Sequence, residues 1–291
     1  MKTEAEQSRS SVIPFIKMHG LGNDYIYMCE FDRPLKHPRA LAVHISHRNF
    51  GVGGDGLVLI GPSEIADFRM RIFNADGSEA EMCGNASRCV GKFLYEHNYT
   101  QKHELTLETG GKVRKLFLTV ESGTVSSVRV DMGIPVFKTA DISMMPEESS
   151  FLNREIIVDG TAWTASALSM GNPHLVIPVE DVAAVDLAYL GPLFERHQLF
   201  PNRINTEFVQ VINPGHILMR VWERGSGETM ACGTGACASL VACALSGLTG
   251  KRAVVTLPGG DLEIEWDVSG TVFMTGPAAE VFSGEYRVPA L

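Results

Sequence analysis

The sequence has 291 residues, of which 45% are apolar and 20% are charged, and a chain of this kind can bury a full core. Lysine and arginine total 25 against 34 aspartates and glutamates, giving a formal net charge of −9, which argues against a nucleic-acid-binding surface. The longest uncharged run, Thr229 to Gly250, is interrupted by glycines and has few large aliphatic residues. We therefore expect no membrane span.

The amino-terminal residues Met1 to Ser11 are polar and lack the apolar stretch of a secretion signal, so we expect a disordered tail over residues 1–12. Six cysteines are too few for a disulfide scaffold in a chain of this length. Without an export signal they are expected to be reduced thiols, and the expected location is the cytoplasm.

Along the chain, the periodicity predicts three helices and a series of short strands. Asn85 to His97 has helical spacing, Asp181 to His197 is amphipathic with a break near Gly191-Pro192, and Gly235 to Leu248 is apolar or small on every face. The strands expected from alternating or β-branched residues are 116–120, 125–132, 155–158, 207–212, 217–222, 253–257, 262–266 and 271–274. Hairpin signals lie at 259–260 and 269–270.

An internal repeat organises the chain. Met70-Arg71-Ile72-Phe73 precedes Cys83-Gly84 by the same interval at which Met219-Arg220-Val221-Trp222 precedes Cys232-Gly233. Without a gap, this offset of 149 residues also aligns Glu79 with Glu228 and Gly22-Asn23 with Gly171-Asn172. Because chance does not hold one register over such a distance, we interpret the chain as two homologous halves. They are expected to join near Asp131 to Pro135, where a strand-like run meets Gly133 and Pro135.

The repeat places Cys83 and Cys232 at equivalent helix starts. Backbone N–H groups without partners and the positive end of the helix dipole favour a thiolate there, and they also form an anion site. Two such helix starts aimed at one substrate carbon could invert a stereocentre, since one thiol would remove the α-proton and the other would return a proton on the opposite face. Like charges raise each other's pKa, so only one sulfur should be a thiolate at a time.

The other four cysteines are expected to be small buried hydrophobic residues: Cys29, Cys89, Cys237 and Cys243. The cysteine spacings contain no C-x2-C pair, so no metal site is expected. A reversible disulfide between the two helix-start cysteines is conceivable, but neither belongs to a C-x-x-C redox motif.

Several motifs resemble the diaminopimelate epimerase family, in order, from about Ile13 to the carboxyl end. They are KMHGLGND at 17–24, NADGSE at 74–79, CGN at 83–85, GNPH at 171–174, Asn205, ERG at 223–225 and CGTG at 232–235. The family interconverts LL- and meso-diaminopimelate without a cofactor, for lysine and cell-wall synthesis in the cytoplasm. The resemblance thus implies an isomerase with diaminopimelate as its small-molecule partner, no nucleic-acid or membrane partner, and a possible homodimer.

The fold implied is α+β, with two pseudo-symmetric domains, each a barrel-like sheet around a central helix, and the active site in the cleft between them. The expected domains are residues 13–131 with a returning carboxyl-terminal segment 278–291, and residues 132–277. Within that segment, the run Val281 to Tyr286 is expected to be a strand beside the first half.

The resemblance also assigns roles to residues. Cys83 and Cys232 match the acid/base pair, and the amides of Gly84, Asn85, Gly233 and Thr234 match the cradle for the reacting carboxylate. The contacts to the distal end of the substrate match Asn23, Asn74, Asn172, Asn205, Glu223 and Arg224, and His174 and Glu223 match groups that tune the thiols. Asparagine is also common in turns and caps, which is the alternative for Asn23 and Asn205; likewise His174 could be purely structural, and Glu79 could simply support its loop.

Three points stay open in the sequence. Gly56 stands where many family members carry glutamine, so a contact from that side chain is absent. A second possible activity is racemisation or epimerisation of proline, hydroxyproline or histidine by a relative of the same superfamily. A possibility from another class is a thiol-based zinc-binding or redox protein.

Overall fold

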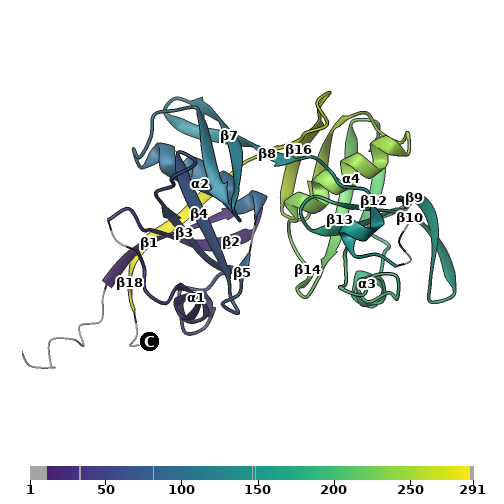
Figure 1. Ribbon diagram of the computed structural model, residues 1–291, viewed down its shortest axis with the longest axis horizontal. Coiled ribbons are helices and arrows are strands. Elements are labelled where there is room, and N and C mark those ends of the chain that lie inside the picture. Colours follow the sequence, from purple (N-terminus) through teal and green to yellow (C-terminus); the bar gives the residue numbers. More distant parts are fainter. Residues whose placement is uncertain (1–11, 33, 81, 146, 148, 289–291) are drawn as a thin grey trace, which may run out of the picture. The chain divides into compact units, whose positions relative to one another are not determined.

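The structure is a computed structural model that describes residues 12–32, 34–80, 82–145, 147 and 149–288 (Figure 1). The tail predicted at residues 1–12 lies outside this description except for Val12, which begins the first strand. The described chain forms two compact units, one of residues up to Ser126 and from Ala278, the other of Ser127–Pro277. The division falls inside one strand, β8 (Thr124–Gly133).

The first unit is a mixed sheet with two helices. Its strands follow the hydrogen-bonded order β18–β1–β2–β3–β4–β6–β7, with β5 paired to β4. The pairs β2–β3 and β4–β6 are parallel and the others antiparallel. Its elements are β1 (Val12–Gly20), β2 (Asn23–Cys29), α1 (Pro38–Ser46), β3 (Gly56–Gly61), β4 (Phe68–Asn74), β5 (Glu79–Ala80), α2 (Gly84–Glu96), β6 (Glu104–Thr109), β7 (Lys112–Glu121) and β18 (Ala279–Arg287).

The second unit repeats this arrangement. Its strand order is β9–β10–β11–β12–β13–β15–β16–β17–β8, with β14 paired to β13 and with β11–β12 and β13–β15 parallel. The elements are the 3-10 helix η2 (Thr139–Ile142), β9 (Phe151–Val158), β10 (Thr161–Ser169), β11 (Pro173–Pro178), α3 (Leu187–Glu195), β12 (Asn205–Asn213), β13 (His216–Glu223), β14 (Gly227–Glu228), α4 (Gly233–Leu245), β15 (Arg252–Leu257), β16 (Gly260–Trp266) and β17 (Val272–Gly276).

The sequence repeat is also a structural repeat with the same offset. The first residues of α1 and α3 are 149 positions apart, and so are their last residues. The same holds for α2 and α4, and for β1 and β10. Even an ion pair recurs: Arg71 Nε lies 2.8 Å from Glu79 Oε1, and Arg220 Nε lies 2.8 Å from Glu228 Oε1. The matching pair Glu79 and Glu228 therefore ties a short hairpin to its strand in each unit.

The helix that follows each repeated cysteine is buried. Helix α4 is built from small and apolar residues and contacts the strands β10, β11, β12, β13, β15, β16 and β17. Leu240 and Val241 on it are fully buried, and each such side chain stabilises the fold by about 2 kcal/mol. Helix α2 is buried from Gly84 to Leu94. Each unit thus holds the start of its buried helix in a fixed place.

Helices α1 and α3 cover part of the sheet in their own units. Leu41 and Ile45 of α1 pack with Phe73, and Leu187 and Phe194 of α3 pack with Phe208. The approach of α3 is close, since a Cβ on Gly191 would lie 2.3 Å from the Trp222 ring. A larger residue at this position would push α3 off β13.

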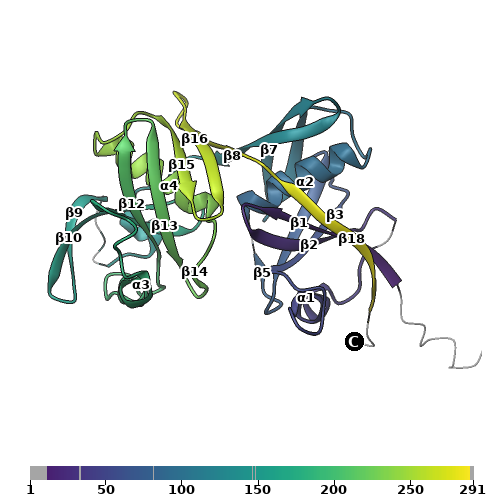
Figure 2. The same cartoon turned by 180° about the vertical axis from the view of Figure 1, so that it is seen from behind.

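The last strand belongs to the first unit. Strand β18 pairs antiparallel with β1, with Tyr286 opposite Ile13 and Ala279 opposite His19. Figure 2 shows β18 in yellow beside the purple β1, although the two lie at opposite ends of the sequence. The sheet of the first unit therefore needs both ends of the chain.

The predicted elements are confirmed in kind, with two corrections. The expected strands lie within or overlap observed ones, and the helices expected at 85–97 and 235–248 appear as α2 and α4. The helix expected at 181–197 starts only at Leu187, because Asp186 caps it by accepting a hydrogen bond from Tyr189 N at 3.1 Å. No break occurs at Gly191-Pro192, since α3 runs through Pro192.

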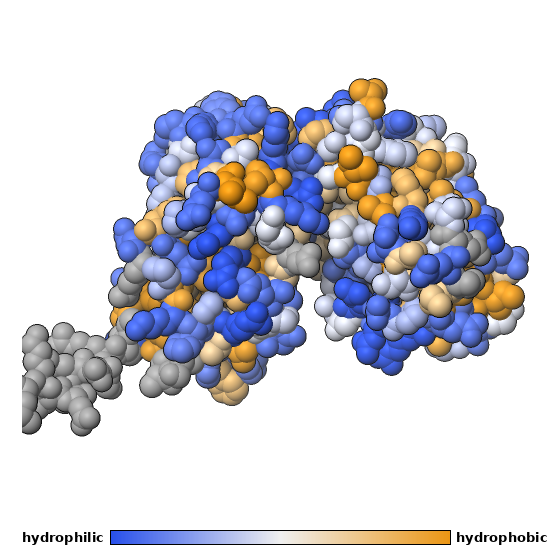
Figure 3. Space-filling view, viewed as in Figure 1, coloured by the Kyte–Doolittle hydropathy of each residue, from blue (hydrophilic) through white to orange (hydrophobic). Residues whose placement is uncertain are grey.

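Within the part of the chain that the structure describes, no helix has the length and apolar character needed to cross a bilayer. The face shown in Figure 3 is mostly hydrophilic in both units, with smaller apolar patches.

Candidate active site

Cys83 is the N-cap of α2, with φ −142° and ψ 112°. Its sulfur accepts a hydrogen bond from Ala86 N at 3.5 Å, so the thiol sits among the first amides of the helix. The thiol also donates to Asn23 Oδ1, 3.5 Å away, and is half-buried. A helix start favours the thiolate of such a cysteine through its positive dipole end.

Asn23 and Asn85 lie beside this thiol. Asn85 Nδ2 donates to Asn23 Oδ1 at 3.2 Å, and Asn23 Nδ2 donates to Asp55 Oδ2 at 2.8 Å. The Asp55 carboxylate therefore fixes the orientation of the Asn23 amide, whose oxygen faces Cys83. Of the remaining residues expected in this unit, Gly84 opens α2, and Asn74 ends β4 with its amide donating to Ser78 Oγ at 3.0 Å.

Cys232 is the N-cap of α4, with φ −121° and ψ 104°, and it is only 4% exposed. Its sulfur lies 3.6 Å from Thr234 Oγ1. Burial raises the pKa of the Cys232 thiol well above its usual value, and the carboxylates of Glu223 and Glu207 raise it further. The Thr234 hydroxyl and the Gly235 amide act in the opposite direction but do not overcome these effects. These surroundings favour the thiol form of Cys232 over the thiolate.

Glu223 ends β13 close to this sulfur. Its Oε1 accepts a hydrogen bond from the Thr229 hydroxyl, which fixes the carboxylate. Burial raises the pKa of Glu223, although its hydrogen bonds with Thr229 and Cys232 limit the rise. The sequence expectation that Glu223 tunes a thiol stays a prediction, and the geometry gives it a definite partner in Cys232.

His174 is fully buried between two side chains. Its Nδ1 lies 2.7 Å from Glu207 Oε1, and its Nε2 lies 3.0 Å from Asn172 Oδ1. Glu207 is also fully buried, and its Oε2 has no hydrogen-bond partner within the described chain. A Cβ on Gly235 would lie 2.6 Å from Glu207 Oε1 and 3.2 Å from Cys232 Sγ, so Glu207 and Cys232 flank the same spot at the start of α4.

Glu207 is the residue that the sequence reasoning missed. The sequence predicts it only as the first residue of the strand 207–212. One signal could identify it: Glu207 is a carboxylate in a buried stretch of strand, two positions after Asn205. A buried charge needs a specific partner.

Asn205 and Arg224 meet through the backbone. Asn205 Oδ1 accepts from Arg224 N at 2.9 Å, and Asn205 Nδ2 donates to Pro173 O at 2.9 Å. The Arg224 guanidinium is exposed and donates to Asn202 O at 3.2 Å. Asn205 therefore shapes the loop that presents Arg224, and most of the guanidinium donors stay available to a ligand.

The two thiols have different surroundings despite the repeat. At the repeat offset, Tyr25 takes the place of His174 and Val58 the place of Glu207. Asn74 takes the place of Glu223. Cys83 thus lacks the two repeat-equivalent carboxylates that raise the pKa of Cys232, so the two cysteines are not chemically equivalent.

Gly56 has a structural reason to lack a side chain. A Cβ there would lie 2.2 Å from Phe73 O and 2.9 Å from Tyr25 Cε1. The closely approaching β4 backbone occupies the space that a glutamine would need.

None of the remaining cysteines is the N-cap of a described helix. Cys89, Cys237 and Cys243 are buried, as expected, whereas Cys29 is half-buried. Among residues whose placement is described, no group of three histidine, cysteine, aspartate or glutamate side chains is arranged to hold a metal ion.

Solved structures share this two-unit fold at low sequence identity. A hydroxyproline epimerase from Agrobacterium vitis is 16% identical, with a TM-score of 0.70 over 96% of this chain and 92% of that one. A phenazine biosynthesis protein of the PhzF family from Bacillus anthracis is 18% identical, with a TM-score of 0.69 over 95% and 99%. The chain has the fold of this class of two-domain proteins, which includes epimerases and racemases.

Sequence relatives narrow the class to one family. The diaminopimelate epimerase family profile matches residues 15–138 and 166–281. The diaminopimelate epimerase of Agathobacter rectalis is 51% identical over 282 residues, covering 94% of this chain and 99% of its own. That of Acetivibrio thermocellus is 52% identical over 272 residues, covering 93% and 97%. The chain belongs to the diaminopimelate epimerase family.

Proposed function

We propose that this protein is an isomerase that epimerises LL-2,6-diaminopimelate to meso-diaminopimelate with Cys83 and Cys232 as its two acid/base groups. The observation that carries the proposal is that two cysteines at equivalent repeat positions each occupy the N-cap position of a buried helix. Relatives about 50% identical over nearly their whole length bear this enzyme's name. The comparisons favour this substrate over proline, hydroxyproline or histidine, because the family profile matched is that of diaminopimelate epimerase.

The reaction uses the thiols in opposite protonation states. In one direction, the Cys83 thiolate takes the α-proton and becomes a thiol, and the electron pair left on the α-carbon delocalises into the substrate carboxylate. The Cys232 thiol then donates its proton to the opposite face and becomes the thiolate. The reverse reaction exchanges the roles. Cys232 suits the acid role at the start because burial and two carboxylates raise the pKa of its thiol.

The first amides of α2 and α4 stabilise the carboxylate in this scheme. Gly84 and Asn85 open one helix, and Gly233 and Thr234 open the other. Donors preorganised in this way oppose the charge that develops in the transition state, and each is worth about 3 kcal/mol. Asn23, Asn74, Asn172, Asn205, Glu223 and Arg224 are proposed to bind the distal amino-acid end, with Arg224 taking its carboxylate.

For a biosynthetic enzyme of this family, the proposed location is the cytoplasm and the proposed assembly is a homodimer. The two-thiol reaction depends on neither the location nor the assembly, because it uses only the residues of one chain.

Kinetic analysis of cysteine variants tests the proposal. Cys83→Ala and Cys232→Ala should each lower kcat/KM for LL-diaminopimelate by about 100- to 10,000-fold, since each removes one proton-transfer group. Cys29→Ala is the control, because Cys29 is half-buried and is not at a helix start. Near-normal turnover by either catalytic variant would refute the two-thiol scheme, and turnover of proline by the wild type without turnover of diaminopimelate would refute the substrate.

A further inference from the structure

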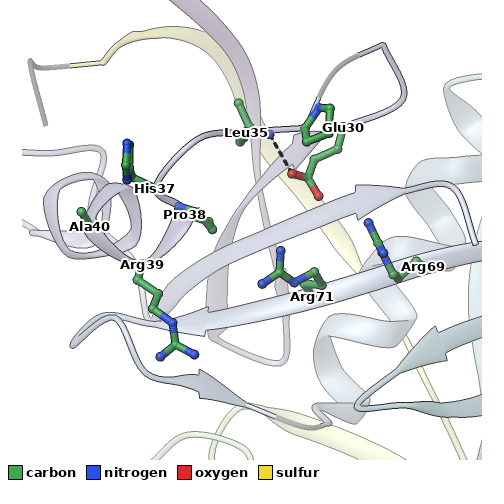
Figure 4. A pocket seen from close by; sticks show the side chains of 9 residues that line it. Glu30, Leu35, His37, Pro38, Arg39, Ala40, Arg69 and Arg71 are labelled. Atoms are coloured by element: carbon green, nitrogen blue, oxygen red, sulfur yellow. Dashed lines mark hydrogen bonds between the residues drawn. The ribbon is translucent and has the colours of Figure 1, made fainter.

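The first unit contains a charged cavity that none of the proposed catalytic residues lines. It has a volume of about 470 Å³ and lies between the end of β2, the start of α1 and strand β4. Figure 4 shows Arg69 and Arg71 projecting from β4 on the side where the Glu30 carboxylate lies. Arg39 and Ala40 of α1 form another part of the cavity wall.

Arginine donors in this cavity remain unused. The Arg69 side chain is partly buried, and its guanidinium makes no hydrogen bond or ion pair within the described chain. Arg71 binds Glu79 through Nε and Nη2, at 2.8 and 3.1 Å, and its Nη1 has no hydrogen-bond acceptor among the residues that the structure describes. Arg39 reaches the same carboxylate only at 3.5 Å. The Glu30 carboxylate also lines the cavity: its Oε1 accepts from Leu35 N at 2.8 Å, and its charge acts on Arg71 without a direct hydrogen bond between them in the described chain.

The second unit provides an internal comparison for this place. At the repeat offset, Arg69 corresponds to Leu218 and Glu30 to Val179, and both of these apolar side chains pack against the core of the second unit. Arg220 corresponds to Arg71, but its Nη1 has acceptors: it donates to Val182 O at 3.2 Å and to Val185 O at 2.9 Å. One copy of the repeat therefore fills the space with apolar side chains, and the other lines it with charges.

Helix α1, which borders the cavity, also differs from its repeat counterpart α3 at the N-cap. The N-cap of α3 is Asp186, whose carboxylate binds Tyr189 N. At the equivalent position α1 has His37, which has φ 52° and makes no side-chain capping bond. The positive end of α1 thus lacks the side-chain acceptor that α3 has, and its residues His37 to Ala40 line the cavity.

We propose that this cavity binds a small oxyanion, a carboxylate or phosphate group of a metabolite, separately from the reaction site. Arg69 and the Nη1 of Arg71 supply charge-assisted hydrogen bonds, and the start of α1 supplies a favourable potential. Charged residues in place of apolar core residues lower the stability of the fold, and a loss of stability of this kind is typical of a functional site. The ligand carries the acceptor that the described chain does not provide.

The test replaces Arg69 of the first unit by the residue found at the equivalent position of the second unit. Arg69→Leu introduces the residue that the second unit has at this position, and Arg196→Leu, which removes an exposed arginine on the second unit, is the charge-matched control. Calorimetric titration would use pyrophosphate and succinate as phosphate and carboxylate probes. The wild type should bind at least one of them saturably, with a dissociation constant of about 1 mM or tighter.

Arg69→Leu should weaken that binding at least tenfold, while Arg196→Leu leaves it within about twofold, since only the first removes a cavity donor. Arg69→Leu should also melt at or above the wild-type temperature, because the second unit packs leucine here. Arg69→Gln serves as a second variant should the leucine variant misfold. Absence of saturable binding of both probes to the wild type, or equal binding by the Arg69 variants, would overturn the proposal.

Discussion

His174 Nδ1 lies 2.7 Å from Glu207 Oε1, and neither side chain is exposed to solvent. The opposite ring nitrogen lies 3.0 Å from Asn172 Oδ1. A buried carboxylate that binds one nitrogen fixes the ring orientation, so Glu207 positions Asn172 through His174. This relationship gives His174 a definite structural role, and it links a residue outside the expected site to one proposed to bind substrate.

The first prediction concerns this link. Glu207→Gln keeps the shape of the side chain but removes the charge that orients His174. We expect kcat/KM to fall by about 10- to 100-fold, because small displacements of substrate-positioning groups have effects of this size. Steady-state kinetics with circular dichroism and thermal melting would check it. If activity fell only in proportion to the folded fraction, Glu207 would be purely structural.

The second prediction concerns the pH dependence of the reaction. The Glu223 carboxylate raises the pKa of the Cys232 thiol, so Glu223→Gln should lower that pKa. The protonated acid would then be lost at lower pH, and the alkaline limb of the kcat/KM profile should move toward lower pH. Glu228→Gln, on the same hairpin but exposed, is the control and should leave the limb in place. A shift toward higher pH would contradict the proposed effect of Glu223.

The third prediction concerns Arg224. Within the described residues its guanidinium has one hydrogen bond, to Asn202 O, and the side chain is exposed. Arg224→Ala should raise KM for diaminopimelate at least about tenfold, because a distal carboxylate loses a charge-assisted contact. Arg203→Ala removes a neighbouring exposed arginine and should leave KM unchanged. An unchanged KM in the Arg224 variant would remove this residue from the site.

The fourth prediction uses the repeated ion pair. Glu79→Ala and Glu228→Ala should each lower the free energy of unfolding by about 1 kcal/mol or less, since both pairs are partly exposed. Arg71 lowers the pKa of Glu79. A lowered pKa contributes stability above the unfolded pKa and loses it as pH falls. The Glu79→Ala penalty, measured by urea unfolding, should therefore shrink in acid; a penalty that grew in acid would contradict this sign.

The fifth prediction concerns alkaline stability. Burial raises the pKa of Cys89 to about 11 and that of Cys243 to about 12. An unfolded thiol titrates near 8.5, so above that pH the folded state holds protons that the unfolded state has released. The free energy of unfolding should fall by about 1.4 kcal/mol per pH unit for each such thiol. Cys89→Ala should reduce this slope between pH 9 and 11 in urea unfolding, and an unchanged slope would contradict the assignment.

The sequence was sufficient to predict the architecture because the repeat is ungapped. An offset recognised from a few residues around Cys83 and Cys232 holds for helices and strands across both units. The sequence does not predict helix α1. The helix expected at 181–197 begins six residues before α3 and ends two residues after it, because the run before α3 is apolar enough to resemble a helix, whereas Asp186 caps the true start.

The site was predictable only in part. Cysteine at a helix start is a local pattern, and both cysteines are N-caps. The pairing of His174 with Glu207 depends on the parallel alignment of β11 and β12, two strands separated by α3, which residue spacing does not reveal. The steric block at Gly56 likewise arises from the approach of the Phe73 backbone, far along the chain.

Strand β18 has a consequence for how the protein is made. During translation, the ribosome releases residues 12–126 long before residues 279–287, which complete their sheet by pairing with β1. The second unit is one continuous segment, so it can finish folding first, although it is synthesised later. Until β18 has been synthesised, the edge of β1 that pairs with it stays unpaired, and an unpaired strand edge can associate with other chains.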